Sequence, residues 1–94
     1  MLEEVKDHLQ ITWDDEDSRI EDIIKRGKAN LEGLAGVELD FVTPGQARTL
    51  LFEYCRYDYN NAADLFEENF QRQLLRLQLN EAANDLQEDD TDEE

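Results

Sequence analysis

The stretch AADLFEENFQRQLLRLQLNEAANDL, residues 62–86, decides which fold this chain adopts. Its apolar residues recur at helical spacing, and at about 100° per residue they fall into two sets. One set shares a single sector of the helix and consists of Phe66, Phe70, Leu74 and Leu77. The other set clusters on roughly the opposite side and consists of Leu75, Leu79, Ala82 and Leu86. The stretch is therefore predicted to form one long helix with two apolar faces.

A chain of 94 residues builds only a modest core, which covers one face of such a helix. The second face stays in water unless another surface covers it. A short N-terminal helix is one alternative cover, but it offers only about three turns of contact. We therefore favour contact with another subunit, and the candidate interface residues are Leu75, Leu79, Ala82 and Leu86. Phe52, which projects away from the inner side of its own predicted helix, is a further candidate.

Three more helices are predicted upstream of this stretch. The first is short and has the apolar stripe Leu2, Val5 and Leu9. The second has the stripe Ile20, Ile23, Ile24, Gly27, Leu31 and Leu34, and Gly36 is its natural stop. Gly27 marks a point where another backbone approaches closely. The inner side of the third helix consists of Ala47, Leu50, Leu51, Tyr54 and Asp58.

A connection and a helix restart separate the second and third of these helices. In GVELDFV, residues 36–42, three apolar residues alternate toward the core: Val37, Leu39 and Phe41. TPGQ, residues 43–46, then predicts a new helix with Thr43 as N-cap and Pro44 in the first helical position. Gln46 is placed to complete a capping box. The pattern as a whole predicts an all-α fold, a small four-helix domain with a long C-terminal helix.

The acid-rich segment ITWDDEDSRIEDII, residues 11–24, is either a metal-binding loop or the start of a helix. A calcium loop of EF-hand type needs Gly at its sixth position and Glu at its twelfth. Counted from Asp14 these positions hold Arg19 and Lys25, and counting from Asp15 fails in the same way. The segment therefore predicts a helix start, with Asp14 or Asp15 accepting hydrogen bonds from free N–H groups. No metal site is expected.

The composition excludes several classes of function. The chain has 25 acidic and 9 basic residues, a net charge of −16, which argues against a face that neutralises phosphates. No apolar run approaches the roughly 20 residues that span a bilayer, and the N-terminal residues MLEEVKDHLQ lack the basic and apolar regions of a signal peptide. We therefore expect an intracellular protein without membrane contact. With one His, one Cys and one Ser and no nucleotide or zinc motif, we expect no catalytic residues, no cofactor and no enzyme activity.

Charge is concentrated at the C-terminus. The last ten residues, DLQEDDTDEE, hold seven acids and no base. Such a run buries too little apolar surface to offset its ordering entropy. We therefore predict a helical domain over residues 1–86 and a disordered acidic tail over residues 87–94.

Four quoted segments, in this order, resemble the head-tail connector (adaptor) proteins of tailed bacteriophages and prophages. They are LEEVKDHLQI, DDEDSRIEDIIKRGKANLEGLAG, TPGQARTLLFEYCRYDYNNA and LFEENFQRQLLRLQLNEA. The resemblance covers the chain to about Glu81. Its features are the short first helix, the acidic lead into an isoleucine-rich helix, the tyrosine-rich junction and the terminal helix. The strongly acidic tail departs from the pattern of that family.

The resemblance implies a structural virion assembly protein without cofactor. Its subunits would assemble in the cytoplasm of the bacterial host as a ring of about a dozen copies, at the head-tail junction of the virion. Its partners would be other copies of itself, the portal protein and a tail-side completion or stopper protein. DNA would pass through the ring without specific binding.

Two alternatives belong to other functional classes. An acidic helical protein is also suited to mimic DNA and to occupy the cationic cleft of a DNA-binding protein. A third class is a helical binding module whose last helix docks in a groove of a partner protein. Self-association to a large closed oligomer separates the connector from both alternatives.

Overall fold

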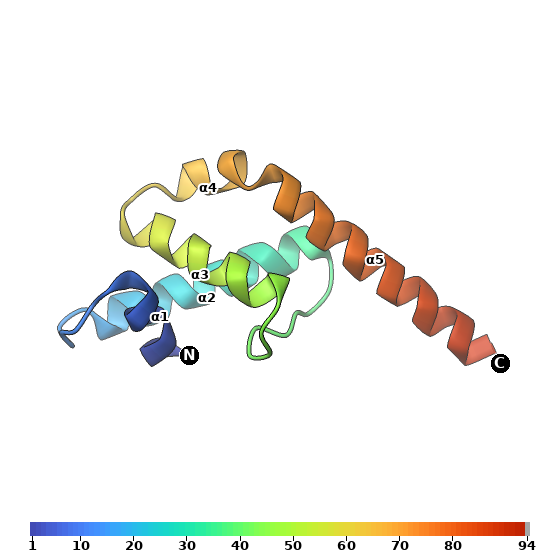
Figure 1. Cartoon of the computed structure of the whole chain (residues 1–94), viewed down its shortest axis with the longest axis horizontal. Coiled ribbons are helices and arrows are strands. Elements are labelled where there is room, and N and C mark those ends of the chain that lie inside the picture. The colour runs from blue at the N-terminus through green and yellow to red at the C-terminus, as the bar shows by residue number, and fades with distance from the viewer. Residues whose placement is uncertain (94) are drawn as a thin grey trace.

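Five helices make up the computed structural model, which describes residues 1–93, with side chains described for residues 1–82. They are α1 (Leu2–Leu9), α2 (Asp17–Ala35), α3 (Gln46–Tyr59), α4 (Ala63–Asn69) and α5 (Gln71–Glu93), and the described chain has no strand (Figure 1). The predicted all-α class is confirmed. The predicted tail, residues 87–94, lies outside the described side chains, and its disorder stays a prediction.

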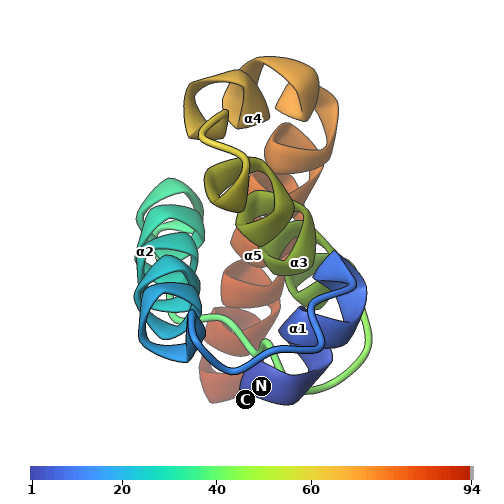
Figure 2. The same cartoon turned by 90° about the vertical axis from the view of Figure 1, so that its left-hand side faces the viewer.

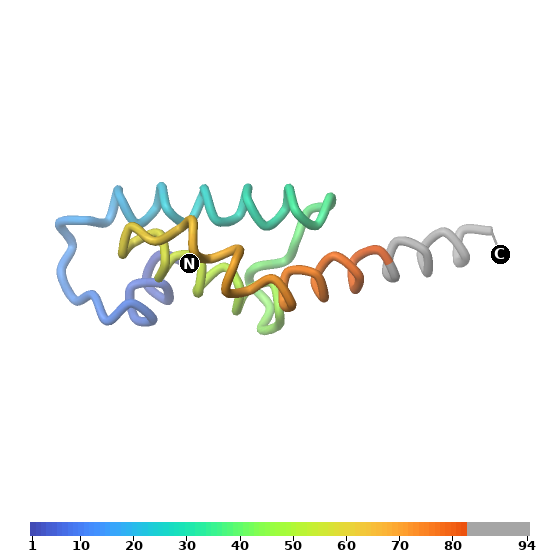
Figure 3. Tube along the Cα trace, turned by 90° about the horizontal axis from the view of Figure 1, so that it is seen from above, coloured from blue at the N-terminus to red at the C-terminus, as the bar shows by residue number. Residues whose placement is uncertain are grey.

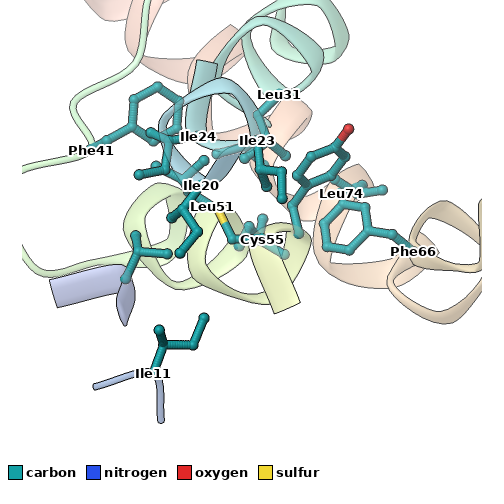
Figure 4. Packing of buried hydrophobic residues seen from close by; sticks show 14 residues of the cluster. Ile11, Ile20, Ile23, Ile24, Leu31, Phe41, Leu51, Cys55, Phe66 and Leu74 are labelled. Atoms are coloured by element: carbon teal, nitrogen blue, oxygen red, sulfur yellow. The ribbon is translucent and has the colours of Figure 1, made fainter. Parts of the chain in front are cut away.

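The centre of the fold is the packing of α2 on α3, which run side by side in opposite directions (Figure 1). The buried side chains of the two helices are Ile20, Ile23, Ile24, Leu31, Leu50, Leu51, Tyr54 and Cys55 (Figure 4). All of them except Cys55 belong to the apolar stripes predicted from the sequence. A Cβ atom added to Gly27 would lie 2.7 Å from Leu51 Cδ1 and 2.8 Å from Tyr54 Cδ1. A close contact at Gly27 is therefore present, but its partners are side chains of α3 rather than the backbone that the sequence led us to expect.

Helix α1 is held against α2 by a buried charge. Lys6 is almost fully buried, and its Nζ lies 2.7 Å from Asp14 Oδ1 and 2.8 Å from Asp17 Oδ1. These carboxylates, Asp14 first, raise the pKa of Lys6 and keep it charged despite its burial. A buried ammonium ion without counter-charges would be strongly destabilising.

The predicted cap at Asp14 or Asp15 is wrong for the same reason. Helix α2 begins at Asp17, and its N-cap residue, Glu16, makes no side-chain cap bond. Asp14 binds the Lys6 ammonium group instead, because that buried charge needs a counter-charge.

The connection between α2 and α3 follows the predicted alternation, with Phe41 buried and Val37 and Leu39 half-buried. Gly36 ends α2 in the left-handed conformation, with φ of 77°. Further along, Asp40 Oδ1 accepts hydrogen bonds from the backbone N–H groups of Val42 (2.9 Å) and Thr43 (3.2 Å). The bonds from Thr43 and Val42 lower the pKa of Asp40.

This turn delays the start of α3, so the prediction that Thr43 and Pro44 cap it is wrong. The N-cap is Gly45, without a side-chain bond, and α3 begins at Gln46. Gln46 does not complete a capping box either. Its Nε2 donates to the Gln73 carbonyl (3.1 Å), and its Oε1 accepts from Asn80 Nδ2 (3.2 Å), so it ties α3 to α5.

The predicted continuous helix over residues 62–86 is broken at Phe70. The described chain therefore has five helices where the sequence predicted four. Phe70 has φ −117° and ψ 22°, and its N–H donates to the Phe66 carbonyl at 3.0 Å. The bend lets α4 pack on α3, whereas α5 packs on α2 as well as α3. Figure 2 shows α4 over α3, on the side away from α1.

Aromatic rings fill this corner of the core. Phe66 is fully buried, edge-on to Tyr54 with ring centroids 5.3 Å apart, and it stacks on Phe70 at 5.0 Å. Tyr57 meets Phe70 edge-on at 5.6 Å. Tyr57 is thus a packing group at the helix junction.

We expect Gly27→Ala to lower the free energy of unfolding by up to about 2 kcal/mol. Overpacking against Leu51 and Tyr54 costs about 1–3 kcal/mol, and alanine's helix preference offsets about 1 kcal/mol of that. Gly33→Ala is the matched control on the same helix, because nothing lies within 4 Å of its added Cβ. It is expected to stabilise by up to about 1 kcal/mol. Denaturant unfolding measures both, and equal stabilisation by the two substitutions would contradict a close contact at Gly27.

Candidate subunit interface

Helix α5 has one buried and one exposed apolar side. Leu74 and Leu77 are buried on the inner side, and Gln78 Nε2 donates to the Leu34 carbonyl at 2.8 Å. On the other side Leu75 is 56% exposed and Leu79 62% exposed, and Ala82 is exposed as well. The two predicted faces are therefore present as far as Ala82. Leu86 lies outside the described side chains.

Helix α1 does not cover the exposed side of α5. It packs on α2 and α3, and within the described residues it makes no packing contact with α5. Figure 3 shows why: α1 lies near one end of the molecule, whereas α5 runs toward the other. The alternative in which the N-terminal helix covers the second apolar face is thus not what the structure contains.

The exposed side of α5 is also positively charged. By helical spacing Arg72 and Arg76 share it with Leu75, Leu79 and Ala82, and these five residues are called the α5 outer face. Both arginines are exposed, and neither has an ion-pair partner among the described side chains. In a chain with net charge −16, the α5 outer face thus combines two features of a protein contact: exposed apolar area and unpaired charge.

Phe52, the fifth candidate, is less free than its position in the sequence suggests. Its ring meets the His8 ring edge-on at 5.5 Å, and the Arg48 guanidinium group lies 4.7 Å from its centroid. It borders a hollow of about 250 Å³ whose lining comes from α1, α3 and the turn before α3. The structure therefore does not bring Phe52 together with the α5 outer face.

The connection between α1 and α2 presents a second exposed apolar group, which the sequence analysis missed. Trp13 is 46% exposed, yet its Nε1–H donates to Glu16 Oε1 at 2.9 Å. The same carboxylate accepts from Tyr59 Oη (2.7 Å) and from Arg19 Nη1 (2.7 Å). Three donors, Trp13 first, lower the pKa of Glu16. A tryptophan directly before four consecutive acids was the available signal, but the partner Tyr59 lies 43 residues away from Glu16.

The family comparison gives this arrangement its context. A family model described as "Phage gp6-like head-tail connector protein" matches residues 1–92 of the chain. The chain belongs to this family. No curated protein and no solved structure matches it. The resemblance seen in the sequence is thereby confirmed, and the chain is a phage head-tail connector of a structural family that assembles with other virion proteins, such as portal and tail components.

Two observations concern reactive groups among the described side chains of this connector. Cys55 is fully buried, and burial raises the pKa of its thiol to about 12, so the thiolate nucleophile does not form at neutral pH. Among the described residues, no three His, Cys, Asp or Glu side chains are grouped to hold a metal ion. No helix in the described part of the connector is long and apolar enough to cross a membrane.

We expect the fluorescence of Trp13, the only tryptophan, to change on acidification with a midpoint below 4.5, the ordinary glutamate value. A group whose pKa is lowered in the folded state contributes stability above its ordinary pKa and loses that contribution as the pH falls through the lowered value. Protonated Glu16 would release the Trp13 N–H group. Glu16→Gln should abolish the transition, and a midpoint at or above 4.5 would contradict the role of these donors.

Proposed function

We propose that this connector assembles head to tail into a closed ring of about a dozen copies, with the α5 outer face as one side of the contact between copies. The observation that carries the proposal is the exposure of Leu75 and Leu79 on a helix whose other side is buried at Leu74 and Leu77. A monomer gains nothing from two exposed leucines beside each other, whereas a neighbouring copy that covers them gains their burial.

The ring would lie beneath the portal, extend the DNA channel and offer a surface to the next tail component. The net charge of −16 supports this placement, because a channel that DNA must leave works best without phosphate-binding surfaces. DNA then passes without specific binding, and the connector acts without catalysis. Family membership favours this function over a DNA mimic or a helical binding module.

We expect Leu79→Asp to abolish assembly while leaving the monomer helical, because a carboxylate at an apolar contact is costly and the side chain is exposed in the monomer. Sedimentation velocity over a wide concentration range, alone and with the cognate portal protein, measures assembly, and circular dichroism measures helicity. The matched control is Leu65→Asp on α4, at a leucine that is 46% exposed but lies off the α5 outer face.

Discrete growth of the wild type to one large closed species, lost in Leu79→Asp and kept in Leu65→Asp, would support the ring. Loss of helicity in the Leu79→Asp monomer would instead place Leu79 in the core. A wild-type chain that stays monomeric both alone and with the portal protein would contradict the proposal.

A further inference from the structure

Two exposed surfaces of this chain each present apolar side chains, and they carry opposite charges. One is the α5 outer face, which is apolar and positive. The other is the α1–α2 connection, where Trp13 is followed by the exposed acids Asp14 and Asp15. We propose that the α5 outer face of one copy binds the α1–α2 connection of a second copy, with Trp13 against Leu75 and Leu79. This inference rests on the proposed ring and names the surface that completes its contact.

Trp13 has the properties of a contact anchor. Tryptophan is the residue type most enriched among the residues that dominate binding energy. Here the bond from Nε1 to Glu16 fixes the indole, and Glu16 is itself fixed by Arg19 and Tyr59. Arg19 adds a hydrogen bond to the Tyr59 carbonyl at 2.9 Å and lies over the Tyr59 ring at 4.7 Å. A side chain ordered before binding loses little entropy when a partner covers it.

The charges around the two surfaces are complementary. Asp15 has no ion-pair partner among the described side chains, and Asp14 is 84% exposed although Oδ1 binds Lys6. On α5, Arg72 and Arg76 likewise have no ion-pair partner among the described side chains. Most other bases are already engaged, such as Arg26 with Asp58 and Arg56 with Glu53. Opposite charges that meet across a contact select the partner and fix its register.

The positions of the two surfaces require two copies. The α1–α2 connection lies at one end of the molecule, and the described part of α5 runs toward the other end (Figures 1 and 3). One chain therefore cannot join its own two surfaces. A contact between unlike surfaces of identical subunits is heterologous, and it repeats until the ring closes.

Leu65 on α4 is the competing acceptor, because it is as exposed as Trp13 and lies near the acids Asp64 and Glu68. However, only Phe70 separates α4 from α5, so Leu65 and the α5 outer face are neighbours on the same copy. Subunits that close a ring need their two contact surfaces on separate parts of the molecule. We therefore assign the contact to the α1–α2 connection.

The test mixes two defective variants under the conditions at which the wild type assembles. Trp13→Ala combined with Asp15→Arg damages the connection and leaves α5 intact, and Leu79→Asp does the reverse. Each variant alone should associate at least about 30-fold more weakly than the wild type. Their equimolar mixture should form a 1:1 dimer and stop there, because only one intact pair of surfaces remains. Sedimentation velocity distinguishes the monomer, the dimer and the ring.

Asp15→Arg alone changes one exposed side chain, so a loss of assembly in this variant would not come from misfolding. Adding Arg76→Glu exchanges the two charges and should restore assembly. Leu65→Ala with Glu68→Arg is the control and should assemble as the wild type does. If the connection variant assembles normally while Leu79→Asp does not, this inference is overturned and the ring proposal stands. A mixture without dimer also overturns it, and a wild type that never assembles overturns both.

Discussion

The contact between α2 and α3 at Gly27 is the one on which the other helices depend. Without a side chain on Gly27, Leu51 and Tyr54 pack directly on the backbone of α2, and the two helices form a pair with one continuous apolar side. Helix α1 lies against both members of that pair, α4 packs on α3, and α5 packs on α2 and α3. A small core with no disulfide has little reserve, so this close approach decides whether the remaining helices have a surface on which to pack.

The sequence predicted well whatever depends on spacing along one helix. The Ile20–Leu34 stripe, the stop at Gly36 and the opposite faces of α5 follow from helical geometry, and the structure contains all of them. The capping predictions at Asp14 and Thr43 were wrong, because the decisive partners are Lys6 and Asp40, and propensity does not say which competing hydrogen bond forms. The break at Phe70 was missed because it depends on two packing surfaces that exist only in the folded chain.

The candidate interface likewise has one part that could be predicted from the sequence and one part that could not. The exposure of Leu75 and Leu79 was predictable, since one helix face and one small core leave the opposite face uncovered. The fixed position of the Trp13 side chain was not predictable, because Glu16 and Tyr59 are brought together only by the packing of α2 on α3. A short polar segment thus acquires a fixed aromatic group through a contact between residues far apart in the chain. Sequence patterns predict surfaces that a single helix forms, and they do not predict surfaces that tertiary packing brings together.

The bend at Phe70 has a geometric consequence for an assembly of such subunits. The backbone angles of this residue set the direction in which α5 leaves the rest of the molecule. If α5 carries the contact between copies, that direction sets the rotation from each subunit to the next and therefore the curvature of the assembly. The width of the lumen would then be encoded in the rings of Phe66, Tyr57 and Phe70, which fix the bend from inside the core. Sequence changes at this corner would then alter the diameter of the passage without changing the residues of the contact itself.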